Sequence, residues 1–259
     1  PIVRASEFLP QCVRPKRATS TQLGWGLTLL VIGLFNKTVI ADYLMAPMVE
    51  VLFDGGAQAG LALAWAGVLA FAVQIYCDFA GYSMCAIGVA LALGFEFPDN
   101  FRFPYAALGF SDFWRRWHVS LSSWLRDYLY ISLGGNRKGA YRTYANLMMT
   151  MLLGGLWHGA AATFVIWGML HGAGLAIERA GRSWLDARFA NKDAAFKRIE
   201  WTPAPRRFSG IRQVIAVLLT FHFVTLCWIF FRSPSLESAL SYLSGLSALN
   251  GALDEVTPF

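Results

Sequence analysis

Hydrophobic residues in this chain gather into long stretches that contain no Asp, Glu, Lys or Arg. Four stretches are about as long as a bilayer-spanning helix or longer: Ala18 to Asn36, Gly55 to Cys77, Thr143 to Ile177, and Gln213 to Phe231. A shorter fifth stretch runs from Phe79 to Phe95. Stretches of this kind predict an all-α, multi-pass transmembrane fold.

The composition supports this class and argues against others. Hydrophobic residues make up 56% of the 259 residues and charged residues only 15%, which is unlike an ordinary soluble domain. The net charge is +6, but the basic residues lie between the hydrophobic stretches, so we expect no nucleic-acid partner. The four cysteines have no CxxC spacing and indicate neither a disulfide nor a metal site: Cys12, Cys77, Cys85 and Cys227.

The start of the chain indicates that more sequence belongs to this protein. It opens at Pro1 without a charged and then apolar signal region, so we expect an internal piece of a longer chain that lacks N-terminal spans. No internal repeat or low-complexity linker divides it. We therefore treat 1–259 as a single domain.

The charge between the stretches predicts the topology. Segment 178–212 carries nine basic residues against four acids, and segment 96–142 carries seven against four. Cytoplasmic loops of membrane proteins are enriched in Lys and Arg, which places both segments in the cytoplasm. The run from Thr143 to Ile177 must then cross an even number of times, as a hairpin. Its arms of about 25 Å are short for a hydrocarbon core of about 30 Å.

The bend of this hairpin is predicted beside His158. Gly154, Gly155 and Gly159 surround that residue and offer the backbone freedom that a bend needs. Because the arms are short, the bend should fall inside the membrane or in a funnel that leads into it. The expected fold therefore has re-entrant or broken helices around a central funnel.

The same parity argument concerns the shorter stretch. If Gly55 to Cys77 returns the chain to the cytoplasm, Phe79 to Phe95 has to be re-entrant or interfacial, because a full crossing would place segment 96–142 outside. Asp78, followed by Gly81, provides a polar break at the required place.

A helix is predicted from Ser111 to Tyr130, where aromatic and leucine residues recur at helical spacing. Arg115, Arg116 and Arg126 lie among them, a composition suited to the membrane interface. His118 falls within this helix. A histidine hydrogen-bonded on a helix face would account for it as well as a catalytic role would.

His158 is the stronger candidate for chemistry. An imidazole in a lipid-length apolar segment is costly to bury, and such residues usually face a cavity or a substrate path. Burial among Leu156, Trp157 and Phe164 should keep the ring neutral and available as a general base. An interfacial or packing role accounts for His171. His222, at the centre of the last span, is explained by helix-to-helix hydrogen bonding as well as by a function in the membrane. Both stay outside the predicted catalytic set.

Two long motifs resemble those of the membrane-bound O-acyltransferase family, in its bacterial polysaccharide branch. They are DFWRRWHVSLSSWLRDYLYISLGGNRKG (Asp112 to Gly139) and TYANLMMTMLLGGLWHGAAATFVIWGMLHG (Thr143 to Gly172). Shorter supporting pieces are YCDFAGYS, GFEFPDNFRFPY and TFHFVTLCWIFFR. The family's two important histidines map onto His118 and His158. Met84 stands where many relatives have Asp, so that position receives no role.

The resemblance implies an enzyme of the bacterial inner membrane. It would move acetyl groups from a cytoplasmic thioester donor, acetyl-CoA or another acyl thioester, across the membrane for O-acetylation of an exported polysaccharide such as alginate. It would work with a periplasmic or membrane-anchored hydrolase-like partner. No bound cofactor is expected. Four basic residues are placed to meet a polyanionic donor, although each could equally bind lipid headgroups: Arg115, Arg116, Arg137 and Lys138.

Two other functions stay open from the sequence. One is D-alanyl transfer to a teichoic acid, as in the Gram-positive branch of the same family. The other is a proton-coupled transporter in which His118, His158 and His222 form a relay. A transporter predicts broken helices in repeated halves, and no such repeat is visible in the sequence. The acceptor polysaccharide, whether alginate, cellulose, peptidoglycan or another glycan, is not fixed by these residues.

Overall fold

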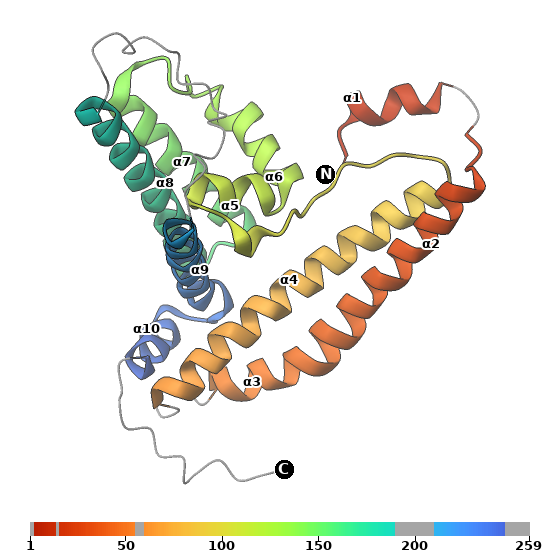
Figure 1. Ribbon diagram of the computed structural model, residues 1–259. Coiled ribbons are helices and arrows are strands. Elements are labelled where there is room, and N and C mark those ends of the chain that lie inside the picture. Colours follow the sequence, from red (N-terminus) through yellow and green to blue (C-terminus); the bar gives the residue numbers. More distant parts are fainter. Residues whose placement is uncertain (1–2, 14–15, 55–59, 190–209, 247–259) are drawn as a thin grey trace. The chain divides into compact units, whose positions relative to one another are not determined.

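A computed structural model describes residues 3–13, 16–54, 60–189 and 210–246 (Figure 1). The regular structure of these residues is helical throughout, which confirms the predicted all-α class. Three helices of this described part are long and apolar enough to cross a membrane: Ser20–Phe53, Gly60–Ala92 and Ile211–Arg232. The described residues divide into two packing units. The first comprises 3–102, 119–121 and 228–246 within those ranges, and the second 103–118 and 122–227.

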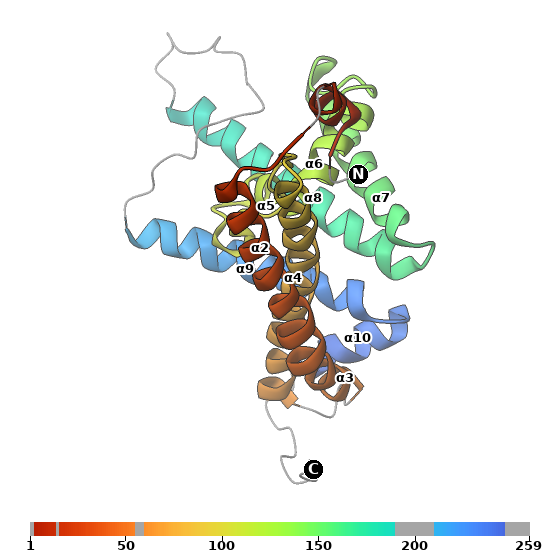
Figure 2. The same ribbon diagram turned by 90° about the vertical axis from the view of Figure 1, so that its right-hand side faces the viewer.

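The first unit is built around two long helical elements. One begins with α2 (Ser20–Leu34), continues as a π-helical segment η2 (Phe35–Met45) and ends as α3 (Ala46–Asp54). Thr19 starts it with a capping box, in which its side chain accepts from the Gln22 amide at 3.2 Å and Gln22 Oε1 accepts from the Thr19 amide at 3.0 Å. The other element is α4 (Gly60–Ala92), and the two views show α2 running alongside it (Figures 1 and 2).

The predicted break at Asp78 and Gly81 is wrong. The helix α4 continues through both residues, so Phe79 to Phe95 is no separate re-entrant segment. Asp78 is accommodated by an ion pair with Lys37 of η2, which also bonds Asp42 at 2.8 Å. Gly81 allows close packing, because a Cβ there would lie 2.7 Å from the carbonyl oxygen of Gly33. Both residues therefore serve the contact between two helices.

The C-terminal helix of the described chain anchors to the same unit. A capping box between Ser235 and Ser238 starts α10 (Leu236–Gly245). Its Tyr242 is buried, donates to the carbonyl of Ala64 at 2.7 Å and stacks on Phe53 with ring centroids 4.2 Å apart. Near the N-terminus, the short helices α1 (Ala5–Phe8) and η1 (Leu9–Cys12) pack Phe8 on Phe95 and Phe97, which follow α4.

The second unit holds the histidine motifs. Its elements are η4 (Pro104–Ala106), α5 (Phe110–Arg116), part of α6 (Val119–Trp124), the π-helical η5 (Leu125–Tyr130), α7 (Gly139–His158), α8 (Ala162–Phe189) and α9 (Ile211–Arg232) as far as Cys227. The bounds of α9 agree with the span predicted from Gln213 to Phe231.

The predicted hairpin is present, and α7 and α8 pack side by side in antiparallel fashion (Figure 1). Its turn covers only Gly159 to Ala161, and α8 runs on to Phe189, beyond the predicted end at Ile177. The remainder of the basic segment, 190–209, lies outside the described residues. Whether the turn is at membrane depth stays a prediction.

The single helix predicted from Ser111 to Tyr130 is wrong. It is divided at Trp117 and His118, where Trp117 is extended and His118 has a left-handed φ of 45°. Helical spacing of the aromatic residues continues across the division, which is why the pattern concealed it. A non-glycine residue with positive φ is uncommon and often marks a functional position.

Candidate active site

His158 is the last residue of α7 and is half-buried. Three aromatic rings lie near its imidazole, with centroid separations of 4.9 Å for Trp157, 5.4 Å for Trp167 and 6.1 Å for Phe164. Leu156, Trp157 and Phe164 were predicted to bury His158. Leu156 and Trp157 cover it less than predicted, since Trp157 is 65% exposed and Leu156 is also exposed. The shelter of the imidazole comes largely from α8.

The predicted role of Gly154 and Gly155 in bending the chain is wrong, because both lie inside α7. Gly155 instead permits the close approach of α8. A Cβ at this position would lie 2.3 Å from the carbonyl oxygen of Phe164, closer than any real contact. The missing side chain therefore lets α8 bring Phe164 and Trp167 to the end of α7, where His158 stands.

His118 occupies the junction between α5 and α6 in a half-buried position. Burial is the largest cause that lowers the pKa of His118 to about 3, and the nearby charge of His158 contributes to the same shift. The two predicted catalytic histidines therefore lie within electrostatic range of each other in the second unit. At neutral pH His118 is a neutral ring that can donate from one nitrogen and accept at the other.

A row of aromatic rings connects His158 at the end of α7 with Trp114 of α5, and it was not predicted from the sequence. Trp167 lies within 5.4 Å of His158, 4.8 Å of His171 and 5.9 Å of Trp114 of α5, measured between ring centroids. His171 is 1% exposed and also faces Phe113 at 6.0 Å. This supports the predicted packing role of His171. The signal was available, because Phe164, Trp167 and His171 recur at helical spacing.

Arg115 and Arg116 converge on the carboxylate of Asp112, at 3.2 Å and 3.0 Å. Asp112 is buried and also accepts from the amide of Leu108 at 3.0 Å. Burial alone would raise its pKa, but the Leu108 amide and the two guanidinium groups together lower it. The cluster therefore holds a carboxylate and two guanidinium groups, and its net charge is +1.

Arg137 and Lys138 lie on a separate element, the exposed turn between η5 and α7. Asn146 of α7 holds this turn by donating to the carbonyls of Gly135 at 2.9 Å and Leu133 at 3.3 Å. The four predicted donor-binding residues thus form two pairs. Arg115 and Arg116 form ion pairs with the buried Asp112. Arg137 and Lys138 are exposed on the turn that Asn146 holds.

His222 is exposed on α9, and its Nδ1 is 2.7 Å from the carbonyl oxygen of Leu218 on the same helix. Hydrogen bonding of His222 to another helix stays a prediction. Within the described ranges, no three His, Cys, Asp or Glu side chains gather in a way that could hold a metal ion.

Comparisons with known proteins place the chain in a family. The family model of the membrane-bound O-acyltransferases matches residues 1–204. This chain belongs to the membrane-bound O-acyltransferase family.

Curated relatives in this family include acetyltransferases of bacterial polysaccharides. A peptidoglycan O-acetyltransferase of Helicobacter pylori is 41% identical over 97% of this chain and 44% of its own length. A protein named as a probable alginate O-acetylase of Azotobacter vinelandii is 44% identical over 92% of this chain and 43% of its own length. A teichoic acid D-alanyltransferase of Bacillus subtilis is 30% identical over 60% of this chain and 37% of its own length. This chain thus spans less than half the length of these relatives.

Proposed function

We propose that the protein containing this chain is an O-acyltransferase of the bacterial inner membrane. It takes an acetyl group from a thioester donor on the cytoplasmic side and passes it across the membrane for O-acetylation of an exported polysaccharide. The observation that carries this proposal is the pair of histidines, His118 and His158, in electrostatic range within one packing unit. The relatives named for alginate and peptidoglycan O-acetylation support the acetyl group and the class of acceptor.

The chemistry assigns His158 the part of general base. Its neutral imidazole takes the proton from an acceptor hydroxyl while the oxygen attacks the thioester carbonyl carbon. A new C–O bond forms, the C–S bond breaks, and the thiolate leaves and recovers the proton from the imidazolium. His118, also neutral, donates a hydrogen bond to the carbonyl oxygen as negative charge develops on it.

The basic residues are proposed to meet the donor. A nucleotide-containing thioester such as acetyl-CoA carries several phosphate charges, which guanidinium groups bind well. Arg137 and Lys138 on the exposed turn are better placed for this than Arg115 and Arg116, whose charge Asp112 partly neutralises. A periplasmic or membrane-anchored hydrolase-like protein would then complete transfer to the sugar hydroxyl.

The decisive experiment measures acetyl transfer from a thioester by the full-length protein in membranes. His158→Ala and His158→Gln should each lower the rate by about 10²- to 10⁴-fold, the usual contribution of a general base. His222→Ala is the matched control and should retain the rate, because His222 is exposed and bonded to its own helix. Wild-type transfer by an inserted His158→Ala protein would overturn the proposal. Loss of activity in His222→Ala would favour a proton relay through that residue.

D-alanyl transfer to a teichoic acid is the second candidate, supported by the 30% identity to the Bacillus subtilis enzyme. The same membranes, supplied with a D-alanyl carrier-protein thioester in place of an acetyl thioester, distinguish the two. We expect the acetyl donor to be used.

A further inference from the structure

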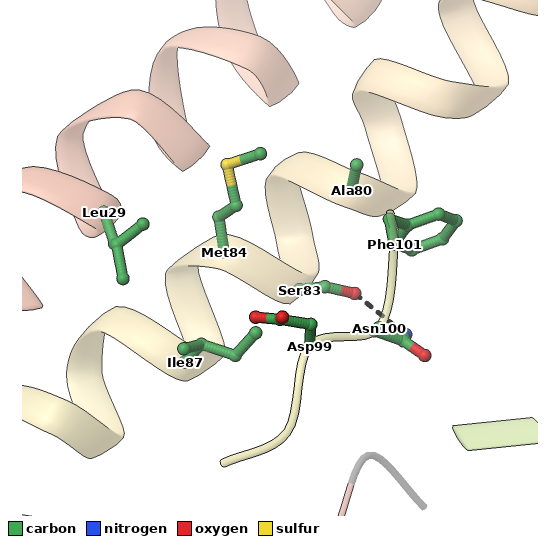
Figure 3. A pocket seen from close by; sticks show the side chains of 8 residues that line it. All are labelled: Leu29, Ala80, Ser83, Met84, Ile87, Asp99, Asn100 and Phe101. Atoms are coloured by element: carbon green, nitrogen blue, oxygen red, sulfur yellow. Dashed lines mark hydrogen bonds between the residues drawn. The ribbon is translucent and has the colours of Figure 1, made fainter. Parts of the chain in front are cut away.

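Asn100 is a buried polar residue in the segment between α4 and η4. It is 2% exposed, although the neighbouring Asp99 and Phe101 are more open. Figure 3 shows its side chain beside Ser83 of α4, at the wall of a pocket of about 160 Å³. Burial of an amide without hydrogen bonds is costly, so its partners indicate why it is there.

The partners of Asn100 are on α4 and in the first turn of α6, all within the first packing unit. Its backbone carbonyl accepts from the amide of Val119 at 2.9 Å. Its side-chain oxygen accepts from the amide and the hydroxyl of Ser120, at 3.1 Å and 3.0 Å. Its side-chain nitrogen donates to the hydroxyl of Ser83 at 3.1 Å (Figure 3). One residue therefore fixes two successive amides that open α6, and is itself held by α4.

These two amides follow directly after His118. The backbone of His118 is left-handed, with φ of 45°, a conformation that a residue with a side chain adopts only where its surroundings enforce it. On the N-terminal side, α5 ends at Arg116 and Trp117 is extended. On the C-terminal side, the chain is held at Val119 and Ser120 by Asn100. Without that hold, α6 could begin elsewhere and His118 could relax to negative φ.

We propose that Asn100 is a positioning residue for His118. By holding the first turn of α6, it keeps the backbone of His118 in the left-handed conformation and so fixes the direction in which the imidazole leaves the chain. This inference rests on the proposed function, since it assumes that His118 takes part in acyl transfer. An asparagine suits the position because one side chain accepts from Ser120 and donates to Ser83.

The test compares the steady-state kinetics of full-length variants in membranes. Asn100→Ala should lower kcat by about 10- to 100-fold, a loss typical of misplacing a group by about 1 Å. The KM values for donor and acceptor should stay within about twofold, because a displaced helper group weakens the transition state rather than ground-state binding. Asn100→Asp keeps an acceptor for Ser120 and should restore much of kcat. Asp99→Asn, in the same pocket but exposed, is the matched control and should be unchanged.

The outcomes separate this inference from the proposed function. If His118→Ala is inactive while Asn100→Ala keeps wild-type kcat, Asn100 positions nothing and the inference alone is wrong. If His118→Ala itself keeps full activity, the role proposed for His118 fails, and with it the basis of this inference. Should Asn100→Ala fail to accumulate in the membrane, Asn100→Ser and Ser120→Ala take its place. Wild-type kcat in both would overturn the inference, and a lowered kcat at unchanged KM would support it.

Discussion

His118 and His158 are sheltered by different means, although both lie in the same packing unit. His158 ends a helix and is covered by rings from α8, whereas His118 stands between two short helices in a left-handed conformation. The motif predicted both residues, but only the structure shows this difference. The position of His118 should therefore depend on the residues that hold the backbone on either side of it. The position of His158 should depend on the size of the aromatic side chains of α8.

The lowered pKa of His118 predicts how stability depends on pH. The folded protein does not protonate this imidazole until about pH 3, whereas an unfolded chain does so near its ordinary pKa of 6.5. Between these values the unfolded state binds more protons, so stability is full above about pH 6.5 and falls as the pH decreases below it. His118→Gln has no such group and should lose less thermal stability between pH 7.5 and pH 4.5. Equal losses in the purified variant and wild type would contradict the predicted burial.

The two basic pairs should respond differently to neutralisation. Arg116→Gln leaves the buried carboxylate of Asp112 with weaker compensation, so it should lower the unfolding temperature. The double variant Arg137→Gln with Lys138→Gln should raise the KM for a polyanionic thioester at unchanged unfolding temperature, because both residues are exposed. Arg188→Gln, an exposed site on α8, is the control for a general charge effect. If the double variant shows the same KM for the thioester as the Arg116→Gln and Arg188→Gln variants, the turn of Arg137 and Lys138 does not bind the donor.

At the scale of elements, two glycines that were predicted to bend the chain instead allow helices to pack closely. Gly81 and Gly155 were predicted to interrupt helices, yet each lies within a continuous helix at a point where another helix crosses closely. A glycine can permit a bend of its own backbone or the close approach of another helix, and a single sequence does not distinguish the two. The distinction depends on which backbone lies opposite, and that is tertiary information.

Gly155→Ala should destabilise the contact between α7 and α8. Its Cβ would lie 2.3 Å from the carbonyl oxygen of Phe164, so the helices must separate. Overpacking of this kind costs about 1–3 kcal/mol, which outweighs the gain of up to about 1 kcal/mol from replacing glycine by alanine in a helix. Gly181→Ala is the matched control on α8, since nothing lies within 4 Å of its Cβ, and it should be neutral or stabilising. Thermal unfolding in detergent measures both. A stable Gly155→Ala protein would mean that the approach is looser than described.

The sequence predicted long helices and the hairpin well and predicted local interruptions poorly. Apolar runs without charge identified α2, α9 and the first part of α4, because length and hydrophobicity suffice for such helices. The hairpin turn was placed within a few residues of Gly159. The division at His118 was missed, because it depends on bonds from Asn100 to Val119 and Ser120. A partner about 20 positions away leaves no trace in helical periodicity.

At the scale of the whole chain, the continuous helix α4 simplifies the predicted topology. A single crossing by Gly60–Ala92 would carry the chain from segment 42–54, whose charged residues are Asp42, Glu50 and Asp54, to the basic segment 96–142. No re-entrant segment is then needed to satisfy the positive-inside bias. The correction therefore removes the one stretch that disagreed with the charge pattern. The hairpin of α7 and α8 remains predicted to cross an even number of times, because basic residues lie at both of its ends.

This topology is testable by labelling two exposed positions with a membrane-impermeant thiol reagent. The background carries Cys12→Ser and Cys85→Ser, because Cys12 is exposed and Cys85 is only partly buried, whereas Cys77 and Cys227 are buried. We expect a cysteine replacing Lys138 to stay unlabelled in sealed cells and to react once the membrane is opened, since it lies in the basic segment. A cysteine replacing Glu237 should react in sealed cells, because α9 is long and apolar enough for one further crossing and the residues after Arg232 carry only acidic charges.

The two positions together decide the parity of the crossings. Labelling of both from outside would leave α9 without a crossing between cytoplasm and periplasm, and labelling of Lys138→Cys alone would invert the whole orientation. In either case the thioester donor could not reach the turn of Arg137 and Lys138 from the cytoplasm. Protection of Lys138→Cys with reaction of Glu237→Cys would instead place that turn where a cytoplasmic thioester is found. His158, at the far end of α7 from this turn, would then lie about 30 Å away along the helix. A donor bound at the turn would have to extend its acyl group along α7 to reach the base.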